Sequence, residues 1–163
     1  MIDRDANHRE CALIIIADGF DEQEVITFLS LMRRAGLCVK SVSLTSGPTG
    51  SAHGVEIIPD LIFSDLAEFL NAAPASMVIL PEWEKNLTRL ENDPRVHRLL
   101  RQVVAQKGQV ATGPQGLRIV RAAEVWNDEQ IKTVLVRQPG QSLEAFTLSL
   151  IRQLKRAYSQ MTR

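Results

Sequence analysis

Residues Val110 to Gln115 are predicted to form a strand that runs into a tight turn and then a helix. Many α/β enzymes hold a catalytic cysteine or serine at such a junction. The helix N-terminus there concentrates unpaired N–H groups and partial positive charge, which favour a thiolate or an oxyanion. In this chain the junction carries Ala111, whose methyl group can neither attack a substrate nor ionise. The sequence therefore predicts that the usual covalent chemistry of this junction is absent.

Thr112, the next residue, could act as a nucleophile only if a base lay within hydrogen-bond reach. The three histidines are poor candidates for that base. His8 lies in the N-terminal tail, His53 in a loop, and His97 beside the apolar face of a predicted helix. A structural threonine at the start of a helix is the favoured interpretation.

Glu24 has two interpretations. It follows Asp21 by three residues, the spacing of a capping box at a helix N-terminus. Such caps contribute about 1 kcal/mol without any catalysis. Alternatively, Glu24 is an acid buried in a cleft, where burial raises its pKa. The capping role is favoured, and the second interpretation stays open.

The elements that must position these side chains alternate between strand and helix. Strands are predicted at 11–17, 38–44, 55–58, 77–80, 109–111 and 131–136, the last preceded by a hairpin turn at 127–130. Helices are predicted between 21 and 36, at 66–72, between 93 and 108, at 114–122 and at 142–158. This order indicates βαβ units, and hence a mostly parallel α/β sheet with helices on both faces. Ligands of such sheets bind beyond the carboxyl ends of the strands, where we expect the loops 18–24, 81–86 and 111–115 to converge.

Length and composition favour one domain, at 11–160, after a loose tail at 1–10. Basic and acidic residues both number 19, so no overall charge attracts nucleic acid or an anionic membrane. The longest apolar run, 11–17, is too short to span a bilayer, and the tail lacks the layout of a secretory signal. We therefore expect a cytoplasmic protein in a reducing environment, with no nucleic-acid or membrane partner.

Cys11 and Cys38 fit no metal spacing and no disulfide framework. They begin adjacent predicted strands, at the end of the sheet away from Ala111. A redox switch would require that they face each other, and two small buried hydrophobic side chains are the favoured interpretation. No cluster has the spacing of a zinc site, and no Gly-x-Gly-x-x-Gly or P-loop is present. The sequence accordingly predicts no metal and no cofactor.

Several motifs in one order resemble those of the ThiJ/PfpI family, and in particular its intracellular-protease-like branch. They are Ala17–Glu24 (ADGFDEQE), Met32–Gly36 (MRRAG), His53–Gly54, Val78–Pro81, Gly113–Gln115, Ala123–Trp126, Arg137–Gly140 and Leu143–Phe146. The resemblance implies a flavodoxin-like three-layer sandwich related to class I glutamine amidotransferases. It also implies relatives that include hydrolases, glyoxalase-like and deglycase-like enzymes, chaperones and stress proteins, usually as dimers or larger oligomers.

The chain departs from the family pattern at three places. The family's reactive cysteine falls on Ala111, and the histidine that often follows it falls on Thr112. The family's glycine-rich loop reads 81–83 (PEW), in which Glu82 and Trp83 narrow the approach to the junction. A piece about as long as a strand plus a helix is missing after Val120. Glu24 survives, and corresponds to the glutamate that sits beside the family's cysteine.

Two functions remain open. The favoured one is a non-catalytic binding, scaffold or chaperone- and stress-related module, forming a homodimer or binding another protein. The alternative is a hydrolase or a glyoxalase- or deglycase-like enzyme with altered chemistry, in which Glu24 is the acid/base. The candidate ligand-binding residues are Asp18, Glu24, Glu82, Trp83, Ala111, Thr112 and Gly113. We also expect Trp83 and Trp126, or a second subunit, to cover the apolar surface that the missing segment exposes.

Overall fold

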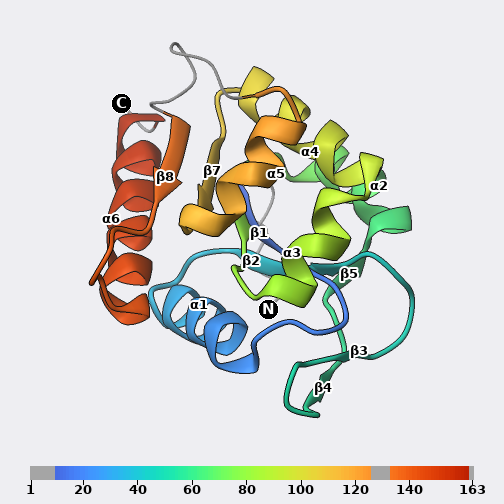
Figure 1. The fold of residues 1–163 in the computed structure, drawn as a ribbon. Coiled ribbons are helices and arrows are strands. Elements are labelled where there is room, and N and C mark those ends of the chain that lie inside the picture. The colour runs from blue at the N-terminus through green and yellow to red at the C-terminus, as the bar shows by residue number, and fades with distance from the viewer. Residues whose placement is uncertain (1–9, 126–132, 162–163) are drawn as a thin grey trace, which may run out of the picture.

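The computed structural model describes residues 10–125 and 133–161, which form a parallel six-stranded sheet between two layers of helices (Figure 1). The strand order is β5-β2-β1-β6-β7-β8. The strands are β1 (Cys11–Ile16), β2 (Val39–Ser43), β5 (Leu61–Ile62), β6 (Ala75–Leu80), β7 (Gln109–Thr112) and β8 (Val134–Val136). A separate antiparallel hairpin joins β3 (Thr49–Gly50) to β4 (Glu56–Ile57). The predicted flavodoxin-like α/β sandwich is confirmed.

The helices divide between the two faces of the sheet. On one face lie α1 (Glu22–Arg34) and α6 (Leu143–Met161). The other face is covered by α2 (Phe63–Ala72), α3 (Glu84–Glu91), α4 (Pro94–Ala105) and α5 (Leu117–Ala122), the last preceded by the short 3-10 turn η1 (Pro114–Gly116). Because strand side chains alternate, Ile14 packs toward α1 and α6 while Leu13 packs toward the other layer. Both are fully buried, as continuous apolar strands between two helical layers should be.

The sequence missed α3, because it assigned 81–86 to a loop. The helix α3 is strongly polar and buries only Asn86, Leu87 and Leu90, so two apolar side chains at helical spacing were too few to identify it from the sequence. The two-residue strands β3 and β5 were missed as well, since elements of that length leave no repeating pattern.

The predicted final strand is confirmed at β8, which pairs in parallel with β7. The predicted hairpin turn at 127–130 lies outside the described residues, as do Trp126 and, except for Glu10, the predicted tail. The assignment of 11–160 to a single domain stays a prediction. None of the described helices is both long enough and apolar enough to cross a bilayer.

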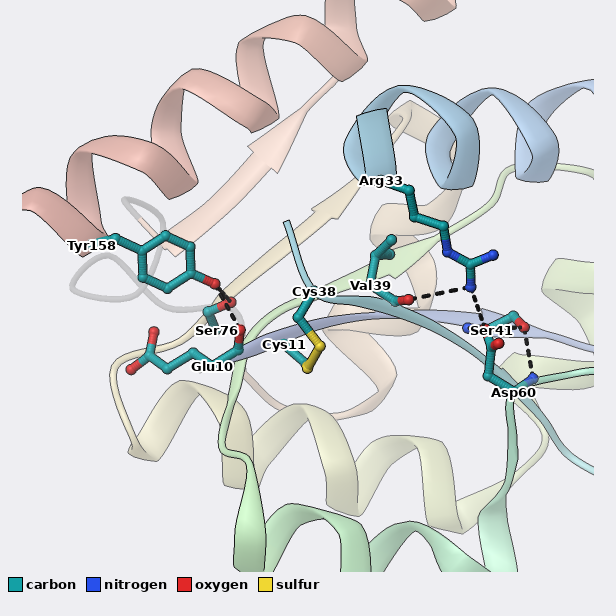
Figure 2. Close-up of a disulfide and its surroundings, with 9 residues drawn as sticks. All are labelled: Glu10, Cys11, Arg33, Cys38, Val39, Ser41, Asp60, Ser76 and Tyr158. Atoms are coloured by element: carbon teal, nitrogen blue, oxygen red, sulfur yellow. Dashed lines mark hydrogen bonds and ion pairs between the residues drawn. A yellow bond between two sulfur atoms is a disulfide. The ribbon is translucent and has the colours of Figure 1, made fainter. Parts of the chain in front are cut away.

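Cys11 and Cys38 form a disulfide at the amino ends of β1 and β2 (Figure 2). The favoured interpretation of two separate buried thiols is therefore wrong. The parallel register pairs Ala12 with Val39, so the preceding residues lie opposite each other, with their Cα atoms 4.7 Å apart. The bridge closes a loop with a sequence separation of 27 residues. Restricting the unfolded chain over such a loop contributes about 3–4 kcal/mol to stability.

Candidate functional site

An open cleft of about 550 Å³ lies at the carboxyl ends of the strands. It is lined by Asp21, Gln23, Glu24, Glu82, Trp83, Glu84, Gln115, Arg137 and Leu143. Four of these side chains are carboxylates and one is a guanidinium, so the cleft is predominantly acidic. In its walls the structure brings together Glu24, Glu82 and Trp83, three of the residues that the sequence predicts for a site.

Glu24 lies in the first turn of α1, where its backbone N–H donates a 3.1 Å hydrogen bond to Asp21 Oδ1. Its own carboxylate does not complete a capping box. Both carboxylate oxygens instead accept from the backbone N–H of Glu82, each at 3.0 Å. The capping interpretation therefore holds for Asp21 but not for the side chain of Glu24.

The pKa of Glu24 is raised to about 7. Burial is the largest cause, and the negative charges of Glu82 and Asp21 act in the same direction. The hydrogen bond from the Glu82 N–H and the charge of Arg137 oppose the shift without cancelling it. A raised pKa is what the second interpretation of Glu24, as an acid buried in a cleft, predicts.

The carboxylate of Glu82 lies over the turn that follows β7. It accepts a 2.8 Å hydrogen bond from the backbone N–H of Gln115 and pairs with Arg137 at 3.2 Å. It also fills the space that a Cβ atom on Gly113 would need, so any side chain at that position would displace it. The turn amide that could hold an external anion is thus already bound to a carboxylate of the protein itself.

Ala111 and Thr112 are buried beneath this turn. Ala111 packs in the core on the side of α1 and α6. The hydroxyl of Thr112 donates to the carbonyl oxygen of Leu80 at 2.9 Å, and a Cβ atom on Gly116 would collide with it. The contacts of Thr112 are those of the favoured structural interpretation, although it ends a strand rather than beginning a helix.

Trp83 stands at the rim of the cleft and is 39% exposed, so it leaves the cleft open. Its ring meets His53 edge-on with the centroids 5.7 Å apart, and His53 Nδ1 lies 3.0 Å from Glu22 Oε1. Asp18 does not join the cleft. It accepts from the Gly50 N–H at 3.0 Å and lines a second hollow, of about 510 Å³.

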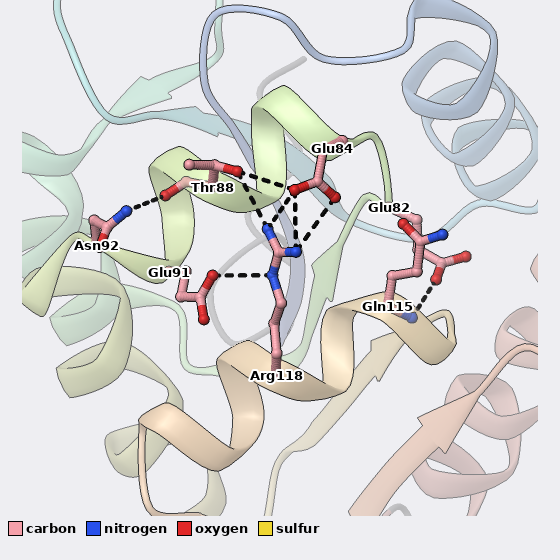
Figure 3. A network of polar contacts seen from close by, with 7 residues as sticks. All are labelled: Glu82, Glu84, Thr88, Glu91, Asn92, Gln115 and Arg118. Carbon is pink, nitrogen blue, oxygen red and sulfur yellow. Dashed lines mark hydrogen bonds and ion pairs between the residues drawn. The ribbon is translucent and has the colours of Figure 1, made fainter.

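The first turn of α3, which follows Glu82 and Trp83, is fixed by Arg118 of α5 (Figure 3). Arg118 pairs with Glu84 at 3.1 Å and with Glu91 at 2.9 Å, near the two ends of α3. Without α3, this contact could not be predicted from the sequence.

Arg137 belongs to the family-like motif Arg137–Gly140 but was not predicted to line the cleft. Its position directly after the parallel strand β8 was the available signal, because ligands bind where such strands end. Among the described residues, no group of three or more histidine, cysteine, aspartate or glutamate side chains could hold a metal ion.

A sequence model of the DJ-1/PfpI family matches residues 10–139, which is most of the chain. The chain belongs to the DJ-1/PfpI family. It is similar to the Parkinson disease protein 7 homolog of Danio rerio, with 32% identity over 110 residues, or 65% of this chain and 57% of that relative. The matched region thus covers little more than half the length of that relative.

Solved structures of DJ-1 proteins share the fold. Drosophila melanogaster DJ-1beta superposes with a TM-score of 0.74 at 19% identity over 90% of each chain. A DJ-1 superfamily protein from Salmonella typhimurium superposes with a TM-score of 0.72 at 18% identity, again over 90% of each chain. At these identities the likeness concerns the fold of this DJ-1/PfpI protein.

The raised pKa of Glu24 predicts how stability depends on pH. The folded-state pKa of about 7 lies above the reference value of 4.5, so the folded chain holds this proton more tightly than the unfolded chain. The wild type should therefore lose stability as pH rises from about 4.5 to 7, by up to about 3 kcal/mol. In Glu24→Gln this loss should vanish, leaving the variant similar to wild type at low pH and more stable above pH 7.

Urea unfolding across this pH range measures the difference. Glu68→Gln, a substitution of an exposed glutamate on α2, is the matched control and should follow the wild type. Parallel pH profiles for the wild type and Glu24→Gln would contradict the assignment.

Replacing Glu82 should leave the Gln115 N–H and Arg137 free to bind a small anion in place of its carboxylate. Glu82→Ala should lower the free energy of unfolding by about 1–3 kcal/mol, because the Gln115 N–H and Arg137 lose their partner. Acetate should then raise the melting temperature of Glu82→Ala more than that of the wild type. Glu84→Ala, which removes a carboxylate paired with Arg118, is the control. An equal response to acetate in both variants would argue against an anion site at the turn.

Proposed function

We propose that this DJ-1/PfpI chain is a non-catalytic binding module whose ligand or partner enters the cleft beside Glu24 and Trp83. The observation that carries the proposal is the occupied turn. Ala111 stands where a nucleophile would be needed, and the carboxylate of Glu82 holds the Gln115 N–H.

Covalent catalysis at such a turn needs a nucleophile and a free donor for the developing negative charge. Thr112 cannot act as the nucleophile without breaking its buried hydrogen bond to Leu80. Arg137 cannot act as the free donor for the developing negative charge while it pairs with Glu82. The open cleft is nevertheless kept, with an aromatic ring at its rim, and this combination favours recognition over turnover.

The second candidate is an enzyme with altered chemistry, a hydrolase or a glyoxalase- or deglycase-like enzyme. The observation that favours it is the pKa of Glu24, which lies near neutral pH in an accessible cleft. A carboxyl group of this kind suits proton transfer, which contributes about 10²–10⁴-fold to a rate.

Turnover of small aldehydes and peptides by the purified protein distinguishes the two candidates. A binding module should give no turnover above that of Glu24→Gln at any pH between 5 and 9, a range of roughly two units either side of neutrality. If the wild type turns over a substrate and Glu24→Gln loses about 10²-fold or more, the enzyme assignment replaces the proposal. Glu68→Gln should leave any measured rate unchanged.

The family resemblance implies a homodimer, and we further propose that it forms through the face that carries α1 and α6. On this face Ile26 is 47% exposed and borders a hollow shared with Leu143 at the start of α6. We also propose that the protein is cytoplasmic.

Ile26→Asp should shift the protein from dimer to monomer, because a carboxylate cannot be buried unpaired at an apolar contact. Sedimentation equilibrium measures the shift. Glu68→Lys, on the opposite face of the sheet, is the control and should not change the mass. A wild type that sediments as a monomer at all concentrations would exclude this dimer.

A further inference from the structure

The disulfide lies at the amino ends of β1 and β2, whereas the cleft lies at the carboxyl ends of the strands. Neither the family's chemistry nor the proposed function uses it. We propose that Cys11 and Cys38 are a reversible redox site that exchanges with a low-molecular-weight thiol–disulfide couple of the glutathione class. Cys38 is the sulfur that exchanges.

Access decides which sulfur is attacked. Cys11 is only 2% exposed, because it begins the strand at the centre of the sheet. Cys38 is half-buried and follows the turn between α1 and β2. Thiol–disulfide exchange proceeds at the sulfur that the incoming thiolate can reach.

The two strands remain in place without the bridge, because other contacts hold each of them (Figure 2). At β1, the hydroxyl of Tyr158 on α6 donates a 2.8 Å hydrogen bond to the carbonyl oxygen of Glu10. Directly after the cysteines, the parallel pairing of Ala12 with Val39 begins.

At β2, Asp60 accepts from the backbone N–H of Ser41 at 2.8 Å and from its hydroxyl at 2.9 Å. Arg33 of α1 pairs with Asp60 at 2.7 Å, so the strand, the helix and the following segment are joined. The two thiols therefore stay adjacent after reduction, and reoxidation is effectively unimolecular. Neither direction requires the chain to unfold.

In the reducing direction, a small thiolate attacks the Sγ of Cys38. The bond between the two protein sulfurs breaks, and its electron pair leaves on the Sγ of Cys11, which takes up a proton. A second small thiolate attacks the sulfur of its own kind in the mixed disulfide and releases Cys38 as a thiolate, which is then protonated. One protein disulfide and two small thiols thus become one protein dithiol and one small disulfide.

Reduction of the wild type by glutathione in native buffer tests reversibility. We expect a rate proportional to the thiolate concentration, insensitive to urea below the unfolding transition, and full reoxidation by glutathione disulfide. A rate that rises with urea in parallel with global unfolding would overturn the proposal, since the bridge would then open only in unfolded chains. This measurement needs no variant.

Single-cysteine variants test which sulfur exchanges. With glutathione disulfide, folded Cys11→Ser should acquire glutathione at Cys38 on the order of tenfold faster than folded Cys38→Ser acquires it at Cys11, as followed by mass spectrometry. Equal rates, or a faster Cys11, would overturn the assignment of Cys38.

The positioning role of Tyr158 gives a second readout. Tyr158→Phe should lower the equilibrium constant for oxidation by about three- to tenfold, because the start of β1 loses a hydrogen bond and the thiols lose proximity. Ser142→Ala removes the hydroxyl that accepts from the Ala145 N–H at the other end of α6, and should leave the constant unchanged. An unchanged equilibrium constant for oxidation in Tyr158→Phe would refute the idea that this contact holds the two thiols close together.

Discussion

The carboxylate of Glu82 is the contact on which the geometry of the cleft depends. Through its side chain it binds the turn after β7 and the arginine after β8. Through its backbone N–H it binds Glu24 on α1. Since Glu82 itself lies between β6 and α3, one residue joins four segments of the chain. A loop of small glycines could make the backbone contact but could not bridge the turn and Arg137.

This arrangement also explains the unusual state of Glu24. Its carboxylate is desolvated between α1 and the loop that carries a second carboxylate, and that neighbour is already committed to Arg137. Arg137 therefore compensates Glu82 more directly than Glu24, whose proton is retained up to about neutral pH. The net charge of the cleft therefore changes near neutral pH, whichever function the cleft serves.

The sequence predicted the layers and the position of the cleft because both follow from local pattern. Continuous apolar runs such as 11–17 mark central parallel strands, and Asp93 followed by Pro94 marks the start of α4. Contacts between residues far apart in the sequence could not be predicted in this way. The disulfide follows from the register of β1 on β2, and the contact of Arg137 with Glu82 joins residues 55 positions apart. The helix α3 was missed because most of its residues are polar and only two leucines mark its buried face, while its contact with Arg118 lies far away in sequence.

The close approach of Glu82 to Gly113 constrains how this protein can change over evolutionary time. A side chain cannot appear at position 113 while Glu82 remains, because the two would occupy the same volume. Loss of Glu82 first would leave Arg137 and the turn amide without their anion. The two positions are therefore epistatic: a side chain can be accepted at position 113 only after Glu82 is replaced, and that first replacement gives a less stable protein. The glycine at position 113 is thus retained for as long as Glu82 holds the turn, whichever function the cleft serves.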